Sequence, residues 1–263
     1  KIFSEIFRNF PKKSDKDNWL QQSKALTEKE ILLNEKPELI ALTRQSEPSS
    51  STQFNASGSG FFVNQSGYVL TNNHVIEGCS KIDLRLSGKE LVGAKLISSD
   101  RLNDLALLKT AAQSSVALPL ETNNAALLAD IYAAGFPFGD SVNSTIKITR
   151  GVVSSLSGFG DNFSQFQIDA AIQPGNSGGP IINKYGNAVG VVVSKLLLDA
   201  EAATRGDVPE NTNFGIKAAI AKSFLSGNGI ATEDPNWYVL EATELAKILS
   251  QATVYVMASG CSR

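Results

Sequence analysis

The sequence predicts an all-β protein, with helices expected only near its two ends. Through its centre, short apolar segments alternate with clusters of Asn, Ser and Gly, which are typical of turns between strands. The close spacing of these segments favours antiparallel strands over units in which a helix links parallel strands. A chain of 263 residues with 42% hydrophobic residues is also long enough to bury a complete core.

Residues 1–37 predict a helical extension that precedes the all-β part. This stretch is charged and poor in glycine, and Thr27 with Glu30 has the spacing of a capping box. Pro37 is expected to end the helix, because a proline disfavours helical geometry in the residue before it. Residues 38–43 are then expected to form the first strand.

The all-β domain is expected to span residues 38–225. A polar, Ser-rich stretch at 44–57 indicates a flexible connection. The strand-like segments that follow are apolar runs between turn residues, at 60–63, 68–70, 82–86, 105–108, 131–134, 167–170 and 188–193. Residues 226–263 predict a C-terminal extension, in which a helix-like run at 241–249 leads into a strand-like run at 252–257.

One histidine and one glycine-flanked serine indicate a catalytic pair. His74 is the only histidine in the chain, and Ser177 lies in the segment Gly-Asn-Ser-Gly-Gly-Pro. An imidazole titrates near neutral pH, so it can take the proton of a serine hydroxyl and return it to a leaving group. Such a base needs a third group that fixes its tautomer, and Asp104, at the start of an apolar run, is the candidate. Each residue alone is common in proteins, but the three contexts in the order His, Asp, Ser predict catalysis.

The motifs around these residues resemble those of the trypsin-like (chymotrypsin-fold) serine endopeptidases, and most closely the bacterial HtrA/Deg type. The similar segments are residues 58–63, 69–76, 104–109, 135–139, 149–154, 169–180 and 213–216. The resemblance implies two antiparallel six-stranded β-barrels. It also implies that Ser177 is the nucleophile, that His74 is the general base and then the acid, and that Asp104 orients His74.

An oxyanion hole is implied by the same resemblance at Gly175, Asn176 and Ser177. Negative charge develops on the former carbonyl oxygen during acyl transfer, and preorganised backbone N–H groups stabilise that charge. The family supplies them from the positions of Gly175 and Ser177. A glycine at the first of these positions permits a sharp turn and close approach to the substrate.

Four residues are expected to shape the substrate pocket. A trypsin-type preference for Lys or Arg would need a carboxylate six residues before the nucleophile, where this chain has Ala171. By resemblance, Val193, Ser194 and Lys195 form the pocket wall. Lys195 departs from the usual small residue and either lies along the surface, narrows the pocket or attracts an acidic side chain. Because a charged side chain is penalised in a neutral pocket, we expect cleavage after small or medium aliphatic residues.

Composition argues against several other classes of function. A net charge of −2, with Lys and Arg dispersed along the chain, gives no sign of nucleic-acid binding. With one histidine and two cysteines, no metal site is expected, and no phosphate or nucleotide motif implies a cofactor. Cys79 and Cys261 are either joined in a disulfide, which would suit an exported protein, or are two free thiols.

The sequence therefore predicts a periplasmic or secreted serine endopeptidase that acts on polypeptides, with homo-oligomers as a further expectation. No signal peptide or membrane span is recognisable, so a targeting segment is expected to have been removed or never to have existed. Residues 226–263 are too few for the PDZ domain that HtrA-type relatives usually carry. Two alternatives stay open: a protease-like binding or scaffold protein with an inactive oxyanion turn, and a peptidase held latent by residues 1–57 or by the loop 199–207.

Overall fold

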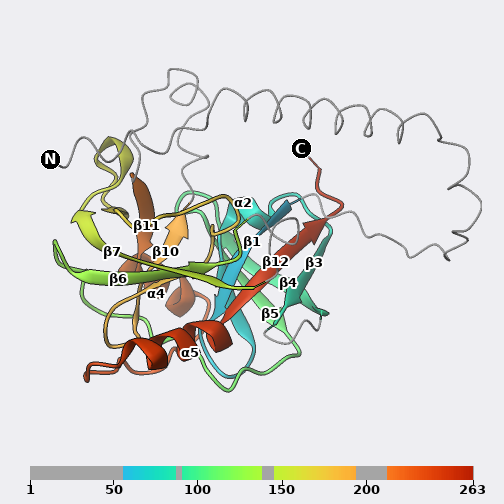
Figure 1. Cartoon of the computed structure of the whole chain (residues 1–263). Helices are drawn as coiled ribbons and strands as arrows, with labels where there is room; N and C mark the ends of the chain where they lie inside the picture. Colours follow the sequence, from blue (N-terminus) through green and yellow to red (C-terminus); the bar gives the residue numbers. More distant parts are fainter. Residues whose placement is uncertain (1–55, 87–90, 138–144, 194–211, 263) are drawn as a thin grey trace, which may run out of the picture. The chain divides into compact units, whose positions relative to one another are not determined.

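The computed structural model describes residues 56–86, 91–137, 145–193 and 212–262. The described residues form two closed β-barrels of six strands each, and the strands of both barrels pair in antiparallel fashion (Figure 1). The predicted all-β fold of two antiparallel six-stranded barrels is therefore confirmed. The helix expected within residues 1–37 and the strand expected at 38–43 lie outside the described residues.

The first barrel joins strands from both ends of the described chain. In hydrogen-bonded order its strands are β1 (Ala56–Phe62), β12 (Thr253–Ser259), β3 (Lys81–Arg85), β4 (Leu91–Asp100), β5 (Leu105–Thr110) and β2 (Tyr68–Thr71). The strand expected in the C-terminal extension 226–263 is thus one of the strands that form this barrel, and it pairs with β1 and β3. The C-terminal strand is therefore part of the double-barrel structure.

The sequence of β12 explains its central position, because all seven of its residues are buried. One face carries Val254, Val256 and Ala258 into the core of the first barrel. The other face carries Tyr255 and Met257, which pack with Phe136, just after strand β6 (Asp130–Gly135) of the second barrel. A strand that is apolar on both faces needs cover on both sides, and a place between the barrels provides it.

The second barrel is built from the middle of the chain. In hydrogen-bonded order its strands are β10 (Ala188–Val193), β11 (Asn213–Lys217), β8 (Gln165–Ile168), β7 (Lys147–Ser155), β6 (Asp130–Gly135) and β9 (Pro180–Ile182). A short 3₁₀ turn, η3 (Phe159–Asp161), lies between β7 and β8. The segment before β9 contains Ser177, so the second barrel carries the candidate nucleophile.

Two helices cover the contact between the barrels. They are α4 (Ala218–Gly227), which follows β11, and α5 (Ala242–Ala252), which leads directly into β12 (Figure 1). The α5 helix begins with a capping box between Glu241 and Glu244. Its buried Leu245 and Leu249 lie one turn apart and join a core cluster that draws on both barrels. No helix of the described part of the chain is long and apolar enough to cross a membrane.

A disulfide between Cys79 and Cys261 ties the segment after β12 to the segment after α2 (Asn73–Ile76). Two backbone hydrogen bonds reinforce this link: Ser262 N donates to Gly78 O at 2.8 Å, and Ser80 N donates to Ser259 O at 3.1 Å. The cross-link therefore closes the first barrel next to the short helix that carries His74.

Candidate active site

Strand pairing brings the segments of His74 and Asp104 to the same edge of the first barrel. β2 runs antiparallel to β5, with Thr71 opposite Ala106. His74 lies in the one-turn helix α2 just after β2, and Asp104 lies just before β5. Residues that are distant in sequence therefore meet where one strand ends and its neighbour begins.

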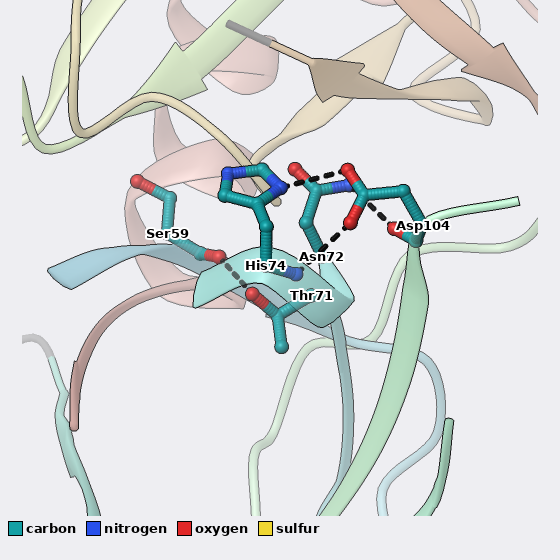
Figure 2. Close-up of polar contacts among 5 residues, drawn as sticks. All are labelled: Ser59, Thr71, Asn72, His74 and Asp104. Atoms are coloured by element: carbon teal, nitrogen blue, oxygen red, sulfur yellow. Dashed lines mark hydrogen bonds and ion pairs between the residues drawn. The ribbon is translucent and has the colours of Figure 1, made fainter. Parts of the chain in front are cut away.

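Two hydrogen bonds join His74 to the carboxylate of Asp104 (Figure 2). The backbone N–H of His74 donates to Oδ1 at 2.9 Å, and ring Nδ1 lies 2.7 Å from Oδ2. Both side chains are largely covered, with 24% and 22% of their surfaces exposed. Because an ionised carboxylate only accepts hydrogen bonds, this contact favours the tautomer with its proton on Nδ1. Nε2 is then left to accept a proton.

The backbone of Asp104 has φ of 54°, in the left-handed region that non-glycine residues rarely occupy. This conformation costs roughly 1–2 kcal/mol and needs support from its surroundings. The side chain of Asn72 donates to the carbonyl oxygen of Asp104 at 2.9 Å (Figure 2). The fully buried Asn72 therefore fixes the backbone whose side chain holds His74.

The turn before Asp104 is held by a second carboxylate, that of Asp100. It accepts hydrogen bonds from the backbone N–H groups of Leu102 and Asn103, both at 3.0 Å, and from the side chain of Asn103 at 2.7 Å. These bonds favour the charged form, and the Asn103 side chain is the main cause of a pKa for Asp100 below its ordinary value. The turn that presents Asp104 is thus stabilised by its own polar residues.

The segment before Ser177 forms a tight turn with glycine at its third position. Asn176 N donates to Gln173 O at 3.0 Å, and Gly175 has φ of 98°. Proline at the second position and glycine with positive φ at the third are features of a type II turn. In a type I turn the central peptide is rotated, so the N–H of Gly175 would face the opposite side. The direction of this predicted oxyanion donor therefore depends on the turn type.

The turn around Ser177 packs against the first barrel. Ser59 N, in β1, donates to Ser177 O at 2.7 Å, and Gly178 N donates to Val192 O at 2.9 Å. A Cβ placed on Gly178 would lie 2.4 Å from Thr71 Oγ1 and 3.0 Å from Asn72 N. The nucleophile segment thus contacts the residues that lead into α2, where His74 lies.

The residues predicted to shape the substrate pocket are only partly described. Ala171 is exposed, and its carbonyl oxygen accepts a hydrogen bond from Thr149 Oγ1 at 3.1 Å. Val193 is the buried last residue of β10, whereas Ser194 and Lys195 lie outside the described residues. The nearby carboxylate of Asp169 accepts the N–H of Val152 at 2.6 Å, so it is engaged with β7.

Two hollows on the second barrel have volumes of about 440 and 540 Å³. Neither is lined by His74, Asp104 or Ser177. Among the residues that the structure describes, there is also no group of three or more His, Cys, Asp or Glu able to hold a metal ion.

Sequence reasoning assigned no role to two buried polar residues beside the site, Asn72 and Ser59. Both lie inside segments that the family resemblance had identified, and both are fully buried. A polar residue next to an apolar strand-like run is the signal that could have found them, because a buried polar group is expected to have a hydrogen-bond partner. The identity of that partner could not be read from the sequence, since it comes from another part of the chain.

The family follows from a direct match. The family model of the trypsin-like peptidase domain matches residues 58–191, about half of the chain. The chain belongs to the trypsin-like peptidase family. The matched segment includes His74, Asp104 and Ser177.

Curated relatives assign the chain to the HtrA-type members of this family, as the motifs predicted. It is 41% identical over 138 residues to a probable periplasmic serine endoprotease, DegP-like, of Hahella chejuensis, covering 52% of this chain and 29% of that protein. It is 32% identical over 178 residues to the serine endoprotease DegS of Haemophilus influenzae, covering 66% and 50%. An uncharacterized protein of Sinorhizobium fredii, y4bJ, is 38% identical over 228 residues, covering 81% and 35%. The chain thus spans half or less of these relatives' lengths.

A solved structure agrees with the barrel architecture. The crystal structure of the serine endoprotease from Yersinia pestis matches with a TM-score of 0.55 at 29% sequence identity. The match covers 66% of this chain and 58% of that one. The two-barrel fold is therefore shared with a protein described as a serine endoprotease.

Proposed function

We propose that this chain is a serine endopeptidase that hydrolyses polypeptides through Ser177, His74 and Asp104. The observation that carries the proposal is the two-point contact of His74 with Asp104, at 2.9 and 2.7 Å. This contact favours the tautomer a general base requires, and it lies beside the segment that carries a glycine-flanked serine. An unreactive scaffold would not need this arrangement.

In the proposed reaction, His74 Nε2 takes the hydroxyl proton of Ser177 as Oγ attacks the carbonyl carbon of the peptide bond. The carbonyl electrons move to the oxygen and form a tetrahedral intermediate. As the C–N bond breaks, the imidazolium returns the proton to the leaving amine, and an acyl-enzyme remains. Water, deprotonated by His74, then releases the acid and restores Ser177. Asp104 stabilises the imidazolium in both steps.

The oxyanion formed in each step would be stabilised by the N–H groups of Gly175 and Ser177. Support comes from the positive φ of Gly175, because the type II turn it permits fixes the direction of its amide. Asn176 lies between the two donors and is buried, so its peptide is shielded from water. Each such donor is typically worth about 2.7–4 kcal/mol of transition-state stabilisation.

We further propose cleavage after small or medium aliphatic residues. Ala171 places no charge at the pocket position that would select a basic side chain. The nearby Asp169 is occupied by a backbone N–H of β7, which argues against its pairing with a substrate cation. Val193 extends the apolar character toward the pocket wall.

A periplasmic or secreted location and homo-oligomeric assembly belong to the same proposal. The DegP-like relatives are named as periplasmic, and a disulfide persists in oxidising compartments. Size determination of the full chain in solution would test the oligomer.

Digestion of an unfolded polypeptide, with mass-spectrometric mapping of the cleavage sites, tests the activity and its preference together. The expected result is cleavage after Ala, Val or similar residues, absent in Ser177→Ala. Cleavage mainly after Lys or Arg would refute the pocket argument, and equal cleavage by Ser177→Ala would refute the nucleophile. No cleavage by the wild-type chain would favour the binding-protein alternative.

A further inference from the structure

Ser59 is a buried polar residue in the middle of β1. It lies in β1 with none of its surface exposed, followed within the strand by the buried Phe61 and Phe62. Burying a hydroxyl costs free energy unless it is hydrogen-bonded, so a serine at this place needs specific partners. The structure supplies partners for its backbone and for its side chain.

Four hydrogen bonds connect Ser59 to the nucleophile turn, to β2 and to the second barrel. Its N–H donates to Ser177 O at 2.7 Å, and its hydroxyl donates to Gly175 O at 2.8 Å. The same hydroxyl accepts the N–H of Phe136 at 2.9 Å, just after β6. Its carbonyl oxygen accepts from Thr71 Oγ1 at 2.7 Å, at the end of β2 (Figure 2). One residue thus bonds to the carbonyl oxygens of the two residues on either side of Asn176.

Backbone hydrogen bonds close the nucleophile turn from within. Within it, Asn176 N donates to Gln173 O and Gly179 N donates to Asn176 O. Asn176 Oδ1 is buried, and among the described residues it has no hydrogen-bond partner. The side chain that lies between the two proposed oxyanion donors therefore offers no anchor through this atom.

Space around the Ser59 hydroxyl is tight. A Cβ placed on Gly135 would lie 2.8 Å from Ser59 Oγ and 2.7 Å from Asn176 Oδ1. The hydroxyl therefore sits in a closed space between β1, the end of β6 and the turn.

We propose that Ser59 is a positioning residue for the oxyanion turn: its hydroxyl fixes the carbonyl of Gly175 and thereby the direction of the neighbouring amides. This inference rests on the proposed peptidase function. The backbone link to Ser177 would survive replacement of the side chain, but Gly175 O and Phe136 N would both lose a buried partner. The central peptide of the turn would then be freer to rotate away from the geometry that directs Gly175 N–H toward the oxyanion.

Ser59→Ala tests the proposal against Ser114→Ala as a matched control. The buried hydroxyl of Ser114 likewise donates to one backbone carbonyl and accepts from one backbone amide, both of Val116, but outside the candidate site. We expect Ser59→Ala to lower kcat about 10- to 100-fold with KM within about 3-fold, because misplacement without loss of a catalytic group has effects of this size. Ser114→Ala should leave both constants near wild type.

A second readout separates positioning from general loss of stability. A peptide aldehyde forms a hemiacetal whose oxygen occupies the oxyanion position, so its affinity should fall by a factor similar to that for kcat. Binding of an uncleaved peptide, measured in the Ser177→Ala background, should not change when Ser59→Ala is added. Equal losses of aldehyde and peptide affinity, or an unchanged kcat, would overturn the inference.

Hydrogen exchange makes the outcome independent of activity. The amides of Asn176 and Gly179, which close the turn, should exchange faster in Ser59→Ala than in wild type and unchanged in Ser114→Ala. If wild type shows no activity, the proposed function fails, and this comparison still decides whether Ser59 holds the turn. Equal exchange in Ser59→Ala and wild type would refute the positioning role by itself.

Discussion

The two barrels hold their halves of the candidate site in different ways. The first barrel positions His74 through contacts within itself: both hydrogen bonds to Asp104, and the bond from Asn72 that supports Asp104, join residues at the meeting edge of β2 and β5. The second barrel carries Ser177, but two bonds to this turn come from Ser59 in the first barrel. The base is thus held within one barrel. The nucleophile turn is bonded to β10 of its own barrel, through Gly178 N and Val192 O, but it also depends on the contact between barrels.

The packing between the barrels agrees with this contrast. Phe136, at the end of β6, contacts the ring of Tyr255 in β12, with ring centroids 5.8 Å apart. The guanidinium of Arg85 lies 4.7 Å from the centre of the same ring. β12 precedes the disulfide-bonded Cys261. Through Tyr255, this strand also supports Phe136, whose N–H donates to Ser59. Damage to the first barrel should reach both halves of the site, and damage to the turn only one.

The largest effect is expected from Asp104→Asn, which disrupts the half of the site that is held within the first barrel. An amide in place of the carboxylate disfavours the tautomer with its proton on Nδ1 and cannot stabilise an imidazolium, so kcat should fall by about 10⁴. Steady-state kinetics on a peptide substrate would measure this. Asp130→Asn is the control, because it also removes a carboxylate, one paired with Arg150 at 2.8 Å, from a site on the second barrel. A loss below 10-fold for Asp104→Asn would remove the orienting role.

The next effect concerns the stability of the first barrel. Replacing Cys79 and Cys261 together by serine should lower the free energy of unfolding by about 2–5 kcal/mol, because the disulfide closes a long loop of the unfolded chain. Urea unfolding of the double variant and of the wild type would give the difference. In the absence of urea kcat should change much less than in Asp104→Asn. A double variant as stable as wild type would show that backbone bonds alone close the barrel end.

A smaller loss of activity is expected from Gly175→Ala, which disrupts the nucleophile turn that depends on the contact between barrels. Alanine at φ of 98° is strained, so the turn should change its conformation and misdirect an oxyanion donor. We expect kcat to fall by about 10²- to 10³-fold at similar stability. Gly160→Ala is the matched control, since Gly160 has φ of 60° in a 3₁₀ turn with open space around it. Equal kinetics for the two variants would contradict the assigned turn geometry.

The smallest expected effect is a pH-dependent change in stability at the turn that presents Asp104. The Asn103 side chain is the main cause of the lowered pKa of Asp100, so ionised Asp100 stabilises the fold at pH above its ordinary pKa of 3.8. That contribution is lost as pH falls through the lowered pKa. Asn103→Ala should therefore destabilise the protein above about pH 4, and the difference from wild type should vanish at lower pH. In an Asp100→Asn background the pH dependence of the Asn103→Ala effect should disappear.

The sequence indicated three candidate catalytic residues because their motifs are local. Glycines around Ser177, the single His74 and Asp104 before an apolar run can each be recognised within a few neighbouring residues. Strands with a continuous apolar pattern, such as β5 and β10, were also predicted. β4 and β7 were missed because most of their residues are exposed or half-buried, which leaves no apolar run to detect.

What could not be predicted depends on contacts between distant segments. The strand at 252–257 was found, but its pairing with β1, nearly the whole described chain away, was not. Ser59 stood in a recognised motif without a role, because its partners Gly175 and Phe136 come from the other barrel. Hydrogen bonds across a fold leave no periodic signal in the sequence.

Covalent labelling by a fluorophosphonate probe, with mapping of the modified peptide, tests the central claim most directly. The probe reacts with a serine only where a base activates it and an oxyanion site stabilises the adduct. The account predicts a label confined to Ser177, abolished in Ser177→Ala and slowed by several orders of magnitude in His74→Ala. No label on the folded wild-type chain, or a label on another serine at equal rate, would contradict it.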